Sequence, residues 1–195
     1  MRSRHLGSLL LALVIVLLAS CASPGGRLQK AGTAATFDMQ LDSELDWSRI
    51  RAPRQELWTI DGTALNSLSI YSGVRQNEHV FMLARERKSR PDGPWFRAGM
   101  RPDELRDVIL DALRGQGWTN VSADNLRPQR FGGVDGLRFD LAMTNPDGLM
   151  YRGTAASAEK GGKLTVLLWK APKENYFERD AAAVNRMLDG MRFVD

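Results

Sequence analysis

Residues 131–144 read FGGVDGLRFDLAMT and carry the clearest structural pattern in the chain. After Gly136, apolar side chains recur at every second position: Leu137, Phe139, Leu141 and Met143. A period of two predicts a β-strand with one buried face. The preceding glycines have neither the G-x-G-x-x-G order nor the Lys-Ser/Thr of a P-loop. They therefore predict a tight turn between two strands rather than a phosphate-binding loop.

Similar strand signals lie on both sides of this stretch. Before it, two apolar segments flank Asp61-Gly62, a dipeptide that is typical of β-hairpins. After it, Asn145-Pro146-Asp147-Gly148 predicts a turn. The further strands that we expect are Leu57–Ile60, Leu65–Tyr71, His79–Ala84, 121–131, 149–156 and 163–170.

Two stretches with helical spacing interrupt the strands. The first begins at Pro102, which suits the first helical turn, and stops at Gly115 and Gly117. The second spans Tyr176 to Met191. Together these patterns predict an α+β fold, with a largely antiparallel β-sheet of about six or seven strands and two amphipathic helices packed on it. Residues 37–195 would form this single domain.

The segment from Arg85 to Arg101 shows neither the strand period of two nor the helical period, and this predicts a long loop. Its six basic side chains outnumber Glu86 and Asp92, and it contains two adjacent aromatic residues. Exposed aromatic residues beside cations suit an anionic surface. We therefore predict contact with a partner or a membrane through Arg85, Arg87, Lys88, Arg90, Trp95, Phe96 and Arg97. The alternative is that both aromatic side chains pack against the core, with the arginines solvated around them.

The N-terminus has the order of a secretory signal: basic residues in Met1–His5, then the unbroken apolar run Leu9–Ala19. This run is shorter than the ~20 residues that span a membrane. The sequence Leu18-Ala19-Ser20-Cys21 that ends it resembles the lipobox of bacterial lipoproteins. The resemblance implies that residues 1–20 are a signal peptide and that Cys21 becomes the first residue, carrying palmitate-type acyl chains. The alternatives are a plain secretory peptide and an uncleaved anchor.

Residues 22–36 are small and polar, and show no apolar periodicity. They predict a flexible tether, so that residues 21–36 comprise the lipidated cysteine and its link to the domain. Ala22, rather than Asp, follows the cysteine. By resemblance to enteric lipoproteins, this implies an outer-membrane location, with the domain facing the periplasm.

Charge and cysteine content exclude several functions. The sequence has 27 basic and 23 acidic residues. Loss of Arg2 and Arg4 with the signal peptide leaves 25 basic residues against 23 acidic ones, which is too small an excess to predict nucleic-acid binding. Cys21 is the only cysteine. Once it is acylated, the chain has no thiol for a disulfide, a thiolate metal site or a nucleophile.

Few residues remain for catalysis or metal binding. His79 is the only histidine outside the signal peptide, and no G-x-S-x-G motif accompanies it. Asp42, Glu44 and Asp46 alternate like the start of an EF-hand loop, but Trp and Pro stand where that loop needs Gly and Glu. We therefore expect no metal and no cofactor. A periplasmic hydrolase using His79, or a small-ligand carrier using the crevice between sheet and helix, are the alternative functions.

The order of elements, the stretch 131–139 and a terminal helix after Lys170-Ala171-Pro172 resemble the PsbP-like fold over residues 55–193. A photosystem II extrinsic subunit, a Ran-binding transport factor and various bacterial lipoproteins share this fold. The resemblance implies a binding or accessory protein rather than an enzyme, and it carries over no functional residue. We therefore predict a lipid-anchored, non-catalytic protein of the cell envelope.

Overall fold

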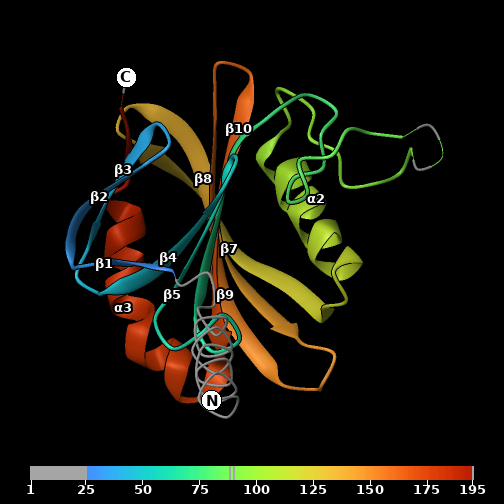
Figure 1. Ribbon diagram of the computed structural model, residues 1–195. Helices are drawn as coiled ribbons and strands as arrows, with labels where there is room; N and C mark the ends of the chain where they lie inside the picture. Colours follow the sequence, from blue (N-terminus) through green and yellow to red (C-terminus); the bar gives the residue numbers. More distant parts are fainter. Residues whose placement is uncertain (1–25, 88, 90, 195) are drawn as a thin grey trace, which may run out of the picture.

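A twisted eight-stranded antiparallel sheet forms the centre of the structure, a computed structural model that describes residues 26–87, 89 and 91–194 (Figure 1). In spatial order the strands are β1 (Arg27–Gln29), β4 (Trp47–Ala52), β5 (Gln55–Thr59), β6 (Ser67–Val74), β10 (Lys163–Pro172), β9 (Met150–Lys160), β8 (Val134–Thr144) and β7 (Thr119–Phe131). Every neighbouring pair is antiparallel.

The path of the chain explains this order. Strands β4, β5 and β6 form one meander; the chain then crosses through helix α2 (Pro102–Gly115) to the far edge. From there β7, β8, β9 and β10 return as a second meander, and β10 pairs with β6. Turn residues set the hairpins: the amides of Leu65 and Asn66 both donate to the Gly62 carbonyl, at 3.0 and 3.1 Å. Gly62 has φ +102°, which glycine tolerates best.

The two faces of the large sheet are covered by different elements (Figure 1). Helix α2 and the loop before it cover one face. The other face carries helix α3 (Glu178–Asp189), which follows the irregular turn η1 (Lys173–Phe177), and a three-stranded sheet. The strands of that small sheet are β2 (Gly32–Thr36), β3 (Met39–Ser43) and β11 (Arg192–Phe193).

Each face has its own apolar core. On the α2 side, Phe139 and Leu141 of β8 belong to the same core as Ile109 and Leu113 of the helix. On the α3 side, three fully buried tryptophans fill the space under α3 and the small sheet: Trp47, Trp58 and Trp169. The alternation from Leu137 to Met143 and both helices are thus confirmed, and α3 begins within two residues of the expected start.

The expected number of strands was too small. The main sheet has eight strands rather than six or seven, and a second sheet of three strands lies beside it. Two of the additional strands, β1 and β2, occupy Arg27–Gln29 and Gly32–Thr36, where a flexible tether was predicted. The tether prediction is therefore wrong from Arg27 onward; residues 21–25 lie outside the described residues.

Small side chains explain why the sequence pattern did not predict β2. Ala34 and Thr36 point inward and are buried, whereas Thr33 and Ala35 face solvent. The period of two is present, but residues this small give almost no hydrophobic signal. Pairing with β3, from Gly32 opposite Ser43 to Thr36 opposite Met39, supplies the order.

The strand predicted at His79–Ala84 is also wrong. Residues 80–82 form a turn, closed by a hydrogen bond from the Leu83 amide to the His79 carbonyl at 3.0 Å, and His79 makes only an isolated bridge to Trp95. Leu83 has φ +55°, which breaks an extended backbone. Val80 and Phe81 are buried, so the apolar pattern reflects burial of a compact loop rather than a strand.

Candidate functional site

A hollow lined by several basic side chains lies at the β1 edge of the main sheet. This hollow, which we call the edge groove, has a volume of about 450 Å³. Its lining residues are Arg27, Leu28, Gln29, Lys30, Thr33, Ala34, Ala35, Arg49 and Arg51. It lies between β1 and β4 on one side and the first strand of the small sheet on the other.

A buried ion pair forms the floor of the edge groove. Arg49 and Glu56 are 8% and 5% exposed, and the Arg49 Nη2 donates to Glu56 Oε2 at 2.7 Å. The Arg49 Nε also donates to Glu56 Oε2, at 3.1 Å, while Nη1 donates to Gln29 Oε1 at 2.9 Å and Nη2 to the Ala35 carbonyl at 3.0 Å. The guanidinium also stacks over Trp58, 4.4 Å from the ring centroid. A buried arginine needs such full pairing, so Arg49 is held rigidly in place.

The exposed cations of the groove are held less firmly. The Nε of Arg51 is 2.8 Å from Glu56 Oε1, although the Arg51 side chain is largely exposed. Lys30 pairs with Asp46 at 2.7 Å, and both side chains are exposed. Arg27 is exposed on β1, opposite Arg49. Four basic side chains therefore line a groove in which Glu56 is the nearest buried acid, and the lining is net positive.

The basic loop is built differently from its prediction. Trp95 is 7% exposed and Phe96 is fully buried in the α2-side core. Two backbone hydrogen bonds hold Phe96 inside: its amide donates to the Glu78 carbonyl at 2.8 Å, and its carbonyl accepts from the Asn77 amide at 2.9 Å. This loop therefore lacks the exposed aromatic residues that the contact hypothesis requires, because Trp95 is buried beside His79 and Phe96 belongs to the α2-side core.

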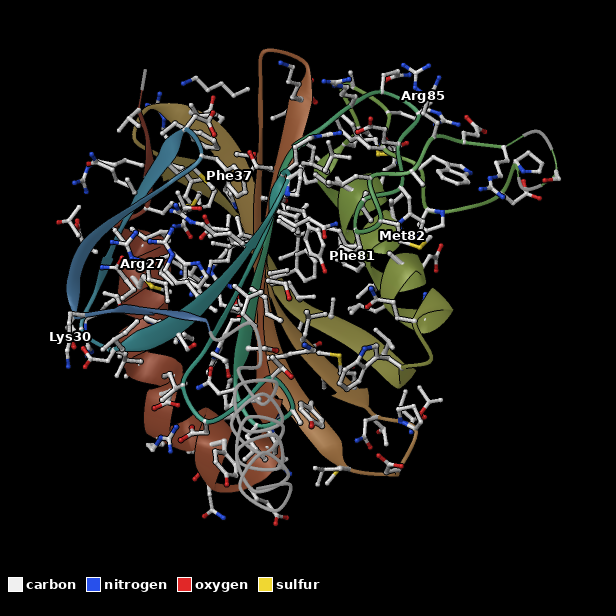
Figure 2. All side chains as sticks on the ribbon, viewed as in Figure 1. Arg27, Lys30, Phe37, Phe81, Met82 and Arg85 are labelled. Carbon is white, nitrogen blue, oxygen red and sulfur yellow. The ribbon has the colours of Figure 1, made fainter. Side chains whose placement is uncertain are left out.

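The cations of this loop lie on the surface. Arg85 and Arg87 are exposed, and Arg97 pairs with Glu86 at 2.9 Å. Lys88 and Arg90 lie outside the described residues. Figure 2 shows Arg85 and Met82 on the opposite side of the molecule from Arg27 and Lys30. The loop and the edge groove are therefore separate basic surfaces.

His79 is used inside the loop. Its Nδ1 accepts hydrogen bonds from the amides of Phe81 at 3.1 Å and Met82 at 3.2 Å. Its ring lies edge-on to Trp95 with centroids 5.8 Å apart. Burial lowers the pKa of His79, which keeps the ring neutral and the Nδ1 lone pair available. Within the described residues, no serine hydroxyl or carboxylate hydrogen-bonds to this ring.

A lysine–serine pair was not predicted from the sequence. The Lys170 Nζ donates to Ser67 Oγ at 2.6 Å, and burial lowers the pKa of Lys170 to about 8. Some hydrolases use a Ser-Lys pair of this kind. Ser67, however, is only 1% exposed, and it lies in β6 beneath Lys170, so a substrate has no path to its hydroxyl. The pair links two central strands.

The alternating acids also have structural partners. Asp42 pairs with Arg192 at 2.7 Å, Glu44 with Arg186 and Asp46 with Lys30. Hydrogen bonds lower the pKa of each of these carboxyl groups. Their side chains are thus directed to three different cations. Within residues 26–87, 89 and 91–194, no three acidic or histidine side chains are grouped to hold a metal ion.

The crevice between the sheet and α2 is filled. Phe96 of the loop, Ile109 of α2 and Phe139 of β8 share one core there. A notch of about 210 Å³ remains where the loop meets the beginning of α2, lined in part by Met100, Leu105 and Leu137.

The predicted lipid attachment site, Cys21, lies outside the described residues. Among the helices that the structure describes, none combines the length and the apolar character needed to cross a bilayer.

Neither a protein-family profile nor a curated protein matches this chain. Solved structures do resemble it. The solution structure of cyanobacterial PsbP (CyanoP) from Synechocystis sp. PCC 6803 matches with a TM-score of 0.56 and 10% identity, over 86% of this chain and 93% of that one.

Two crystal structures match with a TM-score of 0.46. One is a protein of Bacteroides thetaiotaomicron, 9% identical over 86% of this chain and 50% of its own. The other is LpqN, involved in cell envelope biogenesis of Mycobacterium tuberculosis, 11% identical over 90% of this chain and 88% of its own. The similarity to CyanoP, at an identity this low, concerns architecture, and the chain therefore has a PsbP-like fold.

Proposed function

We propose that this chain is a lipid-anchored, non-catalytic protein of the bacterial cell envelope with a binding or accessory role. In this proposal Cys21 carries the lipid, residues 1–20 are removed, and the domain faces the periplasm from the outer membrane. The basis for the anchor is the resemblance of Leu18-Ala19-Ser20-Cys21 to the lipobox.

One observation carries the non-catalytic part of the proposal. Apolar cores fill both faces of the large sheet, and four basic side chains line an open groove at its β1 edge. Reacting groups need a pocket that positions a substrate and excludes water, whereas a binding surface can be open. The edge groove is open, as a binding surface can be.

The alternatives draw less support from the same geometry. A hydrolase would need the His79 ring free to accept a proton, but its Nδ1 accepts two backbone amides. A ligand carrier would need room between sheet and helix, but buried side chains fill most of that space. The shared fold itself does not decide between these functions, because one fold supports many activities.

The anchor is tested by replacing Cys21 with Ser in the full chain and feeding cells a radiolabelled fatty acid. We expect label on the wild-type protein, recovery in the outer-membrane fraction after a salt wash, and loss of both in the variant. Ser20→Gly, which keeps a small residue before the cysteine, is the matched control and should be labelled normally. A Cys21→Ser protein that is still shortened and still resists the salt wash contradicts the proposed anchor.

A further inference from the structure

The distance between the proposed anchor and the sheet is short. Arg27 already pairs with β4, opposite Arg49. Only the five residues of positions 22–26 separate it from Cys21. At ~3.5 Å per residue, a link of this length cannot reach much further than about 20 Å even when fully extended. If Cys21 carries the lipid, as the proposed function states, the β1 edge must stay close to the membrane that holds it.

The β1 edge presents cations on one face. Strand register determines which side chains share a face, because facing residues of paired strands point the same way. Arg27 is opposite Arg49, so its side chain points toward the edge groove, and Arg51 follows on the same face of β4. Lys30 comes just after β1 and also lines the groove.

The other face of the same edge is apolar and unusually exposed. Leu28 is opposite Ser48, and Ile50 lies two residues further along β4 on that face. Their side chains are 59% and 42% exposed. We call Arg27, Leu28, Lys30, Ile50 and Arg51 together the edge surface. An edge with long basic side chains on one face and exposed aliphatic ones on the other suits the boundary between phosphate headgroups and acyl chains.

The acids near the edge surface do not cancel its charge. Glu56 is buried, and its two oxygens are occupied by Arg49 and Arg51. Asp46 is bound to Lys30, but both side chains are exposed, and such a pair is weak in water. Lys30 can therefore exchange Asp46 for a lipid phosphate, while Arg49 stays fixed below and keeps the groove positive.

We propose that the edge surface binds anionic phospholipid headgroups of the membrane that anchors the chain. Arg27, Lys30 and Arg51 contact phosphate oxygens, and Leu28 and Ile50 enter the headgroup layer. The domain thus lies with its β1 edge on the bilayer, and the opposite side, with Arg85 and the loop, faces away (Figure 2). This orientation leaves the loop and α2 accessible to a partner.

The experiment uses the full lipidated protein, extracted in detergent and reconstituted into vesicles. Cys21 is the only native cysteine and is acylated in this protein, so a Leu28→Cys substitution supplies a single free thiol for an environment-sensitive fluorophore. Arg85→Cys supplies the matched probe on the opposite side. Quenching by lipids with spin-labelled headgroups reports how close each probe lies to the bilayer surface.

We expect the probe at position 28 to be quenched in vesicles that contain phosphatidylglycerol, and the probe at position 85 to be unaffected. Each basic side chain near an anionic surface changes affinity about fivefold. Replacing Arg27, Lys30 and Arg51 together by Gln should therefore reduce the quenching at position 28 to the level in pure phosphatidylcholine. Salt at about 1 M, where the Debye length is about 3 Å, should have the same effect.

A charge-matched control replaces Arg85, Arg87 and Arg97 of the loop by Gln and should leave the quenching at position 28 unchanged. Equal quenching at positions 28 and 85, or no effect of the triple substitution at the edge, overturns the proposal. Loss of the quenching in millimolar glycerol phosphate also overturns it, because the groove is then a site for a soluble anion.

Acylation and flotation test the anchor, separately from the quenching that tests the edge surface. If the protein is not acylated and does not float with the vesicles, the proposed function fails before the edge surface is tested. If the protein floats but the probe at position 28 is not quenched, the anchor stands and the inference about the edge surface is wrong.

Discussion

The β1 edge and the long loop from Arg85 to Arg101 are both basic, but they use their apolar side chains in opposite ways. In the loop, Trp95 and Phe96 are buried against the core and the arginines are on the outside. At the edge, Leu28 and Ile50 are exposed while Arg49 is buried. The difference shows that basic and apolar residues close together in the sequence do not by themselves indicate which side chains are exposed to a partner.

Removing the Phe96 side chain should have the largest effect on this comparison. Phe96 is completely buried, and its ring fills the space beside α2. Phe96→Ala should lower the free energy of unfolding by about 3–5 kcal/mol. Urea denaturation followed by circular dichroism measures this change. Leu28→Ala, at the exposed edge, is the control and should change stability by less than about 0.5 kcal/mol. Similar values for the two variants would remove the contrast between the regions.

Glu56→Gln should have a slightly smaller effect. The substitution leaves the buried Arg49 guanidinium without its carboxylate partner, and breaking a buried pair in this way costs about 3 kcal/mol. Thermal unfolding of the variant should therefore start well below that of the wild type. Arg51→Gln, which removes only the exposed partner of Glu56, should cost less than about 1 kcal/mol. If the two variants unfold at the same temperature, Arg49 does not fix the groove.

As the pH decreases, the loop around His79 should lose stability before the ion pairs near the β1 edge break. Burial lowers the pKa of His79 from its ordinary value of 6.5, so the unfolded chain binds this proton more readily than the folded one. Stability is then complete above about pH 6.5 and falls as the pH decreases below it. Protonation also removes the Nδ1 acceptor from the amides of Phe81 and Met82.

Hydrogen exchange at pH 7.5 and 5.5 tests this order. We expect lower protection factors for the amides of Phe81 and Met82 at the lower pH, once the exchange rates are corrected for slower intrinsic exchange there, together with a lower Tm. The carboxyl groups of Asp42, Glu44 and Asp46 have lowered pKa values, so their ion pairs persist at pH 5.5. His79→Ala should abolish the change between the two pH values; if the change persists, another group causes it.

The smallest effect is expected for Arg85→Gln combined with Arg87→Gln. Both side chains are exposed, so we expect a stability change of less than about 0.5 kcal/mol. The vesicle attachment of the lipidated protein should also be unchanged, because its contact lies at the β1 edge. Weaker attachment of this variant in a flotation assay would indicate that the loop contacts the membrane.

Local patterns were sufficient for both helices and for strands β5 to β10, but not for β1 to β4 or β11. Hairpin turns at Gly62 and Gly148 and the alternation in β8 predicted strands that the structure confirms, because each depends on residues close together in the sequence. The helix from Pro102 to Gly115 was also predictable, because proline marks its beginning, glycine marks its end, and its apolar residues have the helical period.

The edge groove could not be predicted in this way. Its floor joins Gln29 to Arg49 and Arg49 to Glu56, and its wall includes the Ala35 carbonyl. These residues form strands only by pairing with one another, since short segments of small or polar residues have no apolar pattern of their own. The Lys170–Ser67 pair was missed for the same reason: its two residues are far apart in sequence and meet because β10 lies beside β6.

The sequence by itself determined where the chain turns, which segments have one apolar face, and the lipobox-like motif that ends at Cys21. Only the tertiary structure decided that residues 27–36 belong to two sheets and that Trp95 and Phe96 face the core. The physical reason is that periodicity reports how a segment would bury its own side chains, whereas strand order and burial of loop residues depend on contacts with distant segments. Those contacts left the β1 edge open and filled the α2 side.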